Sequence, residues 1–219
     1  MNKFNTMIVL AVSILTGCVS NGIPTPHIAG ENDAARNTEK IFLGVPPLLS
    51  LEGSVARLNS EWLITAAHNK PILEGTGREV FYHPTCDVAL VREKGDNVVD
   101  VGKLYTNDNV SVAGYPIYMP LSISEGKYYT DVDLDAGSYP YPDCVYSLTD
   151  AASAQGMSGG GVYNENEELV GVYVGILSDL KFHDAGNEHL NDKTLSAFIY
   201  LGVVRDWIED VTGTKLYKE

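Results

Sequence analysis

Residues 155–162 read QGMSGGGV, with one serine, Ser158, enclosed by glycines. Glycine-rich stretches are most often flexible turns, because glycine has no side chain to restrict the backbone. The pattern Gly-x-Ser-Gly-Gly is nevertheless uncommon. At about 7% usage for each specified residue, it would arise by chance in roughly one chain of this length in two hundred. The stretch therefore carries information that depends on what accompanies it in the chain.

Two segments upstream carry residues that could act with this serine. Residues 62–69 (WLITAAHN) are an apolar, strand-like run that ends in small residues and His68. Residues 81–91 (FYHPTCDVALV) place Asp87 at the start of another apolar run. A single histidine at a strand end is usually a surface or core residue, and an aspartate before an apolar run is usually a turn or cap residue. The order His, Asp, Ser, each with these neighbours, is far more specific than any one segment.

The three segments together resemble the trypsin/chymotrypsin-like serine peptidases, and compact bacterial members in particular. The matching stretches are ITAAH ending at His68, DVALV starting at Asp87, GMSGGG around Ser158, and DWI at 206–208. The resemblance covers residues 41–211. It implies an all-β fold of two perpendicular six-stranded antiparallel β-barrels, at 41–120 and 121–200, followed by a C-terminal helix over 202–212. It also implies that the active site lies in the cleft between the barrels.

The resemblance implies a serine endopeptidase that works through an acyl-enzyme on Ser158. His68 would take the hydroxyl proton and later give it to the leaving amine, and Asp87 would fix the imidazole tautomer. The backbone N–H groups of Gly156 and Ser158 would form the oxyanion hole. This mechanism needs no cofactor and no metal. The alternative is a catalytically silent relative that uses the cleft as a binding module, and a structural lipoprotein of unrelated β-sandwich fold is a third possibility.

The sequence departs from the animal digestive members of this family at several positions. Met157 stands where they carry the aspartate that pairs with a newly cut N-terminus, so we expect no activation by that salt bridge. His68 and Asp87 are only 19 residues apart, which leaves room for one strand (78–82) and two turns.

The substrate pocket is less well defined by the sequence. Ala152 stands where trypsin-type enzymes place an acid, which argues against a strict preference for basic residues. Val174 and Gly175 are expected to form one wall of the pocket and to pair with the substrate backbone. The acidic, Asn-rich segment 178–192 has oxygen ligands that could bind Ca²⁺, but a solvated loop at the pocket rim is the favoured interpretation.

Composition and patterning agree with an all-β protein. The 219 residues are 44% hydrophobic and 20% charged, with 21 Gly and 13 Tyr, which favours a packed domain of strands and turns. The net charge of -14 argues against nucleic acid as a partner and against polybasic adhesion to lipid. Helical spacing over 202–211 ends at Gly213. Strand-like runs occur at 41–45, 54–58, 62–66, 79–82, 88–92, 98–105, 110–115, 128–134, 145–148, 161–163, 169–177 and 195–200.

The N-terminus has the pattern of an export signal. Residues 7–15 are an apolar run, too short to span a bilayer, and Leu15-Thr16-Gly17-Cys18 follows. This resembles the bacterial lipoprotein signal, which implies cleavage before Cys18 and a lipid anchor on that residue. An ordinary signal peptide that ends near a cysteine is the alternative. We expect a signal peptide over 1–17, a tether over 18–40 and the peptidase domain over 41–219. Because Val19 is not aspartate, the outer membrane is favoured over the inner one if the source is Gram-negative.

Two cysteines remain in the predicted domain, Cys86 and Cys144. An exported compartment permits a disulfide between them, although two buried free thiols are also possible. In the fold implied by the resemblance, the two regions approach each other near the barrel interface. We therefore hypothesise that a Cys86–Cys144 bond joins the two barrels beside the active site. The expected partners are a peptide substrate and, through the lipid on Cys18, the cell envelope, with the protein itself a monomer.

Overall fold

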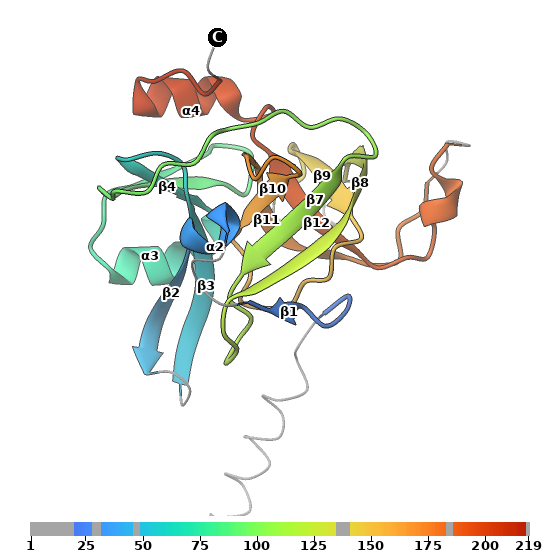
Figure 1. Ribbon diagram of the computed structural model, residues 1–219, viewed down its shortest axis with the longest axis horizontal. Coiled ribbons are helices and arrows are strands. Elements are labelled where there is room, and N and C mark those ends of the chain that lie inside the picture. The colour runs from blue at the N-terminus through green and yellow to red at the C-terminus, as the bar shows by residue number, and fades with distance from the viewer. Residues whose placement is uncertain (1–19, 28–31, 46–48, 135–140, 183–185, 218–219) are drawn as a thin grey trace, which may run out of the picture.

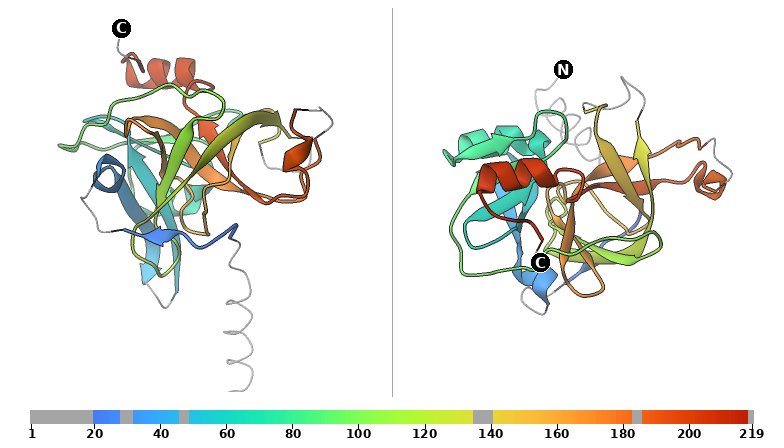
Figure 2. Two further views of the ribbon diagram at one scale, coloured as in Figure 1. Left: turned by 45° about the vertical axis from the view of Figure 1, so that its right-hand side comes forward. Right: turned by 90° about the horizontal axis from the view of Figure 1, so that it is seen from above.

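The computed structural model describes residues 20–27, 32–45, 49–134, 141–182 and 186–217. The expected signal peptide over 1–17 and Cys18 lie outside these ranges. The protein is built mainly of antiparallel strands arranged in two sheets, with the last helix packed on the outside (Figures 1 and 2). Among the residues described, no helix is both long and apolar enough to cross a bilayer.

The C-terminal sheet is a closed barrel of six strands. Neighbours run in the order β8-β7-β10-β11-β12-β9, and β9 pairs with β8 to close the ring. A short strand, β1 (Thr25–Pro26), adds to the outside of β8. The barrel strands are β7 (Asn109–Gly114), β8 (Ser122–Asp133), β9 (Val145–Thr149), β10 (Gly161–Asn164), β11 (Leu169–Leu177) and β12 (Leu195–Tyr200).

The N-terminal sheet has five strands in the order β2-β3-β4-β6-β5. They are β2 (Thr38–Val45), β3 (Leu49–Arg57), β4 (Trp62–Thr65), β5 (Val80–Tyr82) and β6 (Ala89–Arg92). The expected number was six, and the expected strand at 98–105 does not form. The backbone of this segment bonds instead to the other barrel, because Leu169 N donates to Asp100 O at 2.8 Å and Gly102 N donates to Leu169 O at 3.1 Å. The segment therefore connects the two barrels.

One apolar cluster joins the two sheets. It includes Ile64 on β4 and Leu90 on β6 from the first sheet, and Tyr146 on β9 and Val172 on β11 from the second, all of them fully buried. Such burial contributes about 1.5–3 kcal/mol for each large side chain, so the two barrels are held against each other by a shared core.

The helices agree only partly with the sequence. Helix α4 (Arg205–Thr212) forms as expected and ends at Gly213, which adopts the left-handed φ of 69°. Between His68 and Asp87, however, a 3-10 turn (Ala67–Asn69) and helix α3 (Lys70–Gly75) replace the expected first turn. Pro71 lies in the first turn of α3, where its missing N–H costs nothing, and Ile72 and Leu73 bury the helix against the sheet.

The expected tether over 18–40 is wrong for the residues described within it. Besides β1, this region contains helix α2 (Asp33–Arg36), capped by Asn32, whose Oδ1 accepts from Ala35 N at 2.8 Å. Ala34 and Ala35 are buried, and Asn21 bonds to the C-terminal barrel. The polar composition of 18–40 suggested a solvated linker. The polar side chains instead cap helix α2 and bond to a buried loop of the C-terminal barrel. The folded domain therefore includes 20–27 and 32–40.

Candidate active site

His68 and Asp87 meet at one edge of the N-terminal sheet because of strand register. Thr65, the last residue of β4, pairs with Ala89, the first residue of β6. His68 follows the first strand by three residues and Asp87 precedes the second by two, so both lie at the same end. His68 Nδ1 lies 2.6 Å from Asp87 Oδ2, and His68 N donates to Asp87 Oδ1 at 2.8 Å. Both carboxylate oxygens are thus occupied by a single residue.

Burial differs sharply between these two side chains. The Asp87 side chain is 1% exposed, whereas that of His68 is 39% exposed. A buried carboxylate needs charge-assisted partners, and the two bonds to His68 supply them. The carboxylate fixes Nδ1 of His68, whereas Nε2 makes no hydrogen bond within the described residues.

Ser158 lies on a turn that only glycines allow. Gly156 has φ of 97° and Gly159 has φ of 89°, values that other residues rarely adopt. A side chain at Gly159 would bring its Cβ within 2.0 Å of Thr65 Oγ1 and 2.1 Å of Ser54 O. The close approach of the turn to the N-terminal sheet is therefore the reason for glycine at this position.

Two residues of the N-terminal sheet region, Ser54 and Asn69, hold the Ser158 turn. Ser158 O accepts from Ser54 N at 2.9 Å and from Asn69 Nδ2 at 2.9 Å. Asn69 directly follows His68, so the residue beside the imidazole bonds to the residue that carries the hydroxyl. Ser54 adds a third contact, since its Oγ donates to Gly156 O at 3.0 Å. The sequence did not indicate Ser54, and it indicated Asn69 only as the neighbour of His68.

The Ser158 hydroxyl itself donates to Val174 O at 3.5 Å, a long hydrogen bond. In the described part of the chain, no hydrogen bond joins it to His68. The structure thus brings His68 into contact with Asp87 and bonds the Ser158 turn to β3 and to Asn69, the residue after His68. It leaves the hydroxyl rotated toward β11.

The N–H groups expected to form an oxyanion hole have no partner in the described residues. Gly156 N and Ser158 N donate no hydrogen bond there, whereas Met157 N, Gly159 N and Gly160 N all do. The carbonyl oxygen of Gly156, unlike these N–H groups, is already bonded, because it accepts from Ser54 Oγ. Two unused donors two residues apart on a rigid turn can bind a developing negative charge.

No family model and no curated protein matches the chain. Solved structures do. The active form of the Rv3671c protease from M. tuberculosis superposes with a TM-score of 0.62 and 20% identity, over 89% of this chain and 90% of that one. The fold is that of the trypsin-like serine proteases. The HtrA-type protease AlgW with a tripeptide gives 0.58 and 16% identity over 82% of this chain and 62% of AlgW. The protease domain of MamO from Magnetospirillum magneticum gives 0.54 and 16%, over 82% and 96%.

The residues expected to line the substrate pocket lie on the loop at 151–153 and on β11. Ala152 is half-buried, Val174 is buried and Gly175 is half-buried, and none of the three carries charge. Met157 is fully buried in an apolar cluster with Tyr173 and Phe198, so no carboxylate exists at this position of the turn. Among the residues described, no group of acidic, His or Cys side chains could hold a metal ion.

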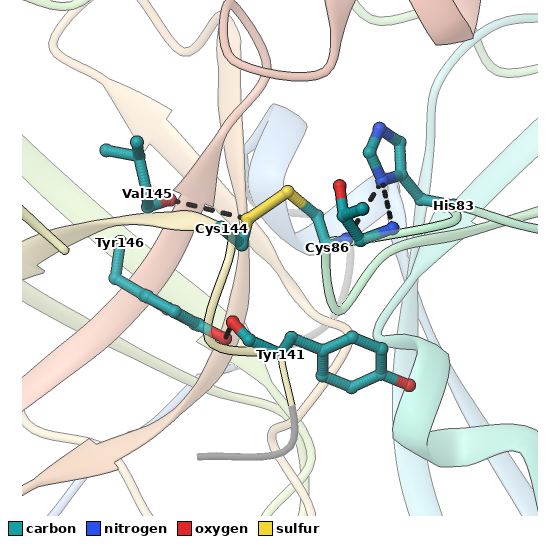
Figure 3. The surroundings of a disulfide bond; sticks show 7 residues. His83, Cys86, Tyr141, Cys144, Val145 and Tyr146 are labelled. Atoms are coloured by element: carbon teal, nitrogen blue, oxygen red, sulfur yellow. Dashed lines mark hydrogen bonds between the residues drawn. A yellow bond between two sulfur atoms is a disulfide. The ribbon is translucent and has the colours of Figure 1, made fainter. Parts of the chain in front are cut away.

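Cys86 and Cys144 form a disulfide with an S–S distance of 2.06 Å, which confirms the hypothesis (Figure 3). Cys86 precedes Asp87, and Cys144 precedes β9 of the other barrel, so the bond joins the two barrels next to the acid. His83 lies beside it: its Nδ1 accepts from Cys86 N at 2.9 Å, and its ring packs edge-on against Trp207. Burial lowers the pKa of His83, which favours the neutral ring that accepts the bond from Cys86 N.

Proposed function

We propose that the protein is a serine endopeptidase with His68, Asp87 and Ser158 as its catalytic triad. The observation that carries the proposal is the buried Asp87, both of whose oxygens bond to His68 beside a glycine turn with two unused N–H donors. A purely structural histidine would not need a buried carboxylate on one nitrogen while its side chain stays 39% exposed.

In the proposed reaction, Ser158 Oγ attacks the carbonyl carbon of the scissile peptide while His68 Nε2 takes the hydroxyl proton. Asp87 stabilises the resulting imidazolium. The carbonyl oxygen becomes an oxyanion that accepts from Gly156 N and Ser158 N. The tetrahedral intermediate collapses to an acyl-enzyme as His68 gives its proton to the leaving amine. Water then attacks the acyl carbon while His68 takes its proton. The bond between Ser158 Oγ and the acyl carbon breaks as His68 returns that proton to Oγ, which releases the carboxylic acid.

The substrate backbone is proposed to pair with β11 at Val174 and Gly175, and its side chain to enter a pocket that includes Ala152. In support, Val174 O already accepts a hydrogen bond from Ser158 Oγ, so β11 lies within bonding distance of the nucleophile. Ala152 offers no charge for a Lys or Arg side chain. AlgW, which shares the fold, has been solved with bound peptides.

The second candidate is a catalytically silent binding module, which the rotation of the Ser158 hydroxyl toward Val174 favours. A fluorophosphonate probe distinguishes the two, because it reacts only with a serine that a neighbouring base activates. The wild-type protein should label, and Ser158→Ala should not label while keeping the same unfolding temperature. Folded wild-type protein that does not label would leave the binding module as the function.

We further propose that the protein is exported and anchored to the bacterial cell envelope by lipid on Cys18, at the outer rather than the inner membrane if the source is Gram-negative. The disulfide supports export, since such bonds persist in oxidising compartments. Mass spectrometry of the N-terminal peptide should show acylated Cys18, and Cys18→Ala should move the protein to the soluble fraction. A membrane-fraction protein whose N-terminal peptide carries no acyl chain would exclude the anchor.

A further inference from the structure

Asn21 is bonded into the loop that precedes the candidate nucleophile. Its Nδ2 donates to Ala151 O at 3.1 Å and to Ser196 Oγ at 3.0 Å. Its Oδ1 accepts from Ser153 N at 2.6 Å, and Ser153 Oγ lies 3.2 Å from the same oxygen. The backbone joins in as well, because Asn21 N donates to Ser153 O at 3.2 Å. One side chain from the N-terminal segment thus satisfies polar groups of two distant parts of the barrel.

The groups that Asn21 bonds are buried, so their bonds are costly to lose. Ser153 and Ser196 are both 0% exposed. They also bond to each other, Oγ to Oγ at 2.6 Å, and Ser196 Oγ donates to Ala151 O at 2.6 Å. An asparagine amide offers an acceptor and two donors, which this cluster uses together. Removing the amide would leave Ser153 N without a partner in the described residues.

This polar cluster leads directly to the Ser158 turn. Ser153 Oγ also lies within hydrogen-bond distance of Tyr173 OH, at 2.8 Å. The backbone of Tyr173 in turn bonds to the turn itself, since Gly159 N donates to Tyr173 O at 2.7 Å and Tyr173 N donates to Gly160 O at 2.9 Å. The loop at 151–153, β11 and the turn that presents Ser158 are therefore connected through Ser153.

The N-terminal segment also touches the proposed pocket residue. A side chain at Gly22 would place its Cβ 2.9 Å from Ala152 Cβ, so the backbone at Gly22 packs directly on Ala152. Ser20 adds an antiparallel bridge to Ala154. The segment therefore runs alongside the whole of 151–154, with Asn21 and Gly22 at its centre.

We propose that Asn21 is a positioning residue for the specificity pocket: it holds the segment 151–153 in the conformation that accepts the substrate side chain. This rests on the proposed peptidase function. It places Asn21 and Gly22, which lie three and four residues after Cys18, beside the proposed substrate site.

The test compares two reactions of the purified full-length protein. Fluorophosphonate labelling reports Ser158, His68 and the oxyanion hole and makes little use of the pocket. Hydrolysis of a quenched peptide, chosen by cleavage profiling of the wild type, also requires the pocket. For Asn21→Ala we expect KM to rise at least tenfold, with the labelling rate within about threefold of wild type. The matched control is Asn97→Ala, an exposed asparagine whose Nδ2 bonds only to Arg36 O among the described residues.

Two additional measurements keep the outcome interpretable if Asn21→Ala unfolds. Gly22→Ala leaves the Asn21 amide intact but pushes on Ala152, and it should raise KM in the same way. Asn21→Asp keeps the acceptor for Ser153 N but turns a carboxylate oxygen toward Ala151 O, so hydrogen exchange at 150–154 should rise in the folded protein.

The outcomes separate the two proposals. Wild-type protein that neither labels nor cleaves would overturn the peptidase function. Wild-type protein that does both, with an unchanged KM in Asn21→Ala and Gly22→Ala, would overturn the role of Asn21 alone. Labelling and hydrolysis that fall by the same factor in every variant would show a merely structural role and would also overturn it.

Discussion

Ser54→Ala should lower the free energy of unfolding and loosen the turn that carries Ser158, because the Ser54 hydroxyl bonds the N-terminal sheet to the C-terminal barrel. Ser54 lies on β3 and is 0% exposed. Its Oγ donates to Gly156 O at 3.0 Å and accepts from Tyr115 N at 2.9 Å. Alanine removes both bonds and leaves no space for water that would replace them. Its backbone bond to Ser158 O would be retained.

The size of the effect follows from the two groups left unpaired. Leaving a buried donor or acceptor without a partner costs about 1–3 kcal/mol. Gly156 is buried and Tyr115 is half-buried, so the second cost falls at the lower end. We expect a loss of about 2–4 kcal/mol in the free energy of unfolding, which is a large part of the 5–15 kcal/mol that is typical of a domain. Because Gly156 N is a proposed oxyanion donor, the labelling rate should also fall, by about tenfold or more.

The assay is urea unfolding followed by fluorescence, with fluorophosphonate labelling of the folded protein in parallel. Ser50→Ala is the matched control, since Ser50 lies on the same strand, is half-buried and donates one bond to Glu52 Oε1 at 2.8 Å. The control should lose less than about 1 kcal/mol. A Ser54→Ala protein within about 0.5 kcal/mol of wild type would refute the reasoning that this hydroxyl joins the barrels.

Three further changes test the surroundings of the site. Asp87→Asn should lower the fluorophosphonate labelling rate by about 10³–10⁴, because an amide favours the wrong tautomer of the imidazole; an unchanged rate would remove Asp87 from the triad. Cys86→Ser with Cys144→Ser opens a bond that spans 58 residues, and loop entropy predicts a loss of about 4 kcal/mol in urea unfolding. Burial lowers the pKa of His83, so below its unfolded value near 6.5 the unfolded chain binds more protons, and stability falls as pH falls, by at most about 1.4 kcal/mol per pH unit. His83→Phe should remove that part of the pH dependence between pH 7 and 5, and identical pH dependence in the two proteins would contradict this.

The residues predicted from the sequence are those that lie in local patterns. His68, Asp87 and Ser158 each end or begin an apolar run with recognisable neighbours, and the register of β4 with β6 then brings the first two together. Helix α4 was also predictable, because its apolar spacing and terminal glycine are local. Most strands followed at least in part from short apolar or alternating runs, but β1 and the first half of β8 did not. The run at 98–105 forms no strand: Val99 is buried, Val98 is exposed, and the backbone bonds to Leu169.

The residues that escaped prediction act through contacts between distant segments. Asn69 reaches a carbonyl 89 residues away, and Ser54 reaches one 102 residues away. Asn21 bonds to Ser153, 132 residues later. A serine or asparagine in a polar stretch has the composition of a solvated loop, and nothing in one sequence indicates which buried group it will satisfy. Their roles depend on packing of the two barrels, which only the structure supplies.

Because the described residues within 18–40 are folded and do not form a flexible tether, a lipid on Cys18 would restrict where the domain can lie. A flexible linker over 18–40 would have an average end-to-end distance of about 5–6 Å times the square root of its length, which is about 25 Å, and the domain could move through that range. Three residue steps separate Cys18 from Asn21, which can span at most about 10 Å. On the proposal that Cys18 carries lipid, the segment bonded to Asn21 is therefore held close to the membrane surface. The substrates best placed for cleavage are then chain segments that lie near that surface, because the domain cannot swing away from it.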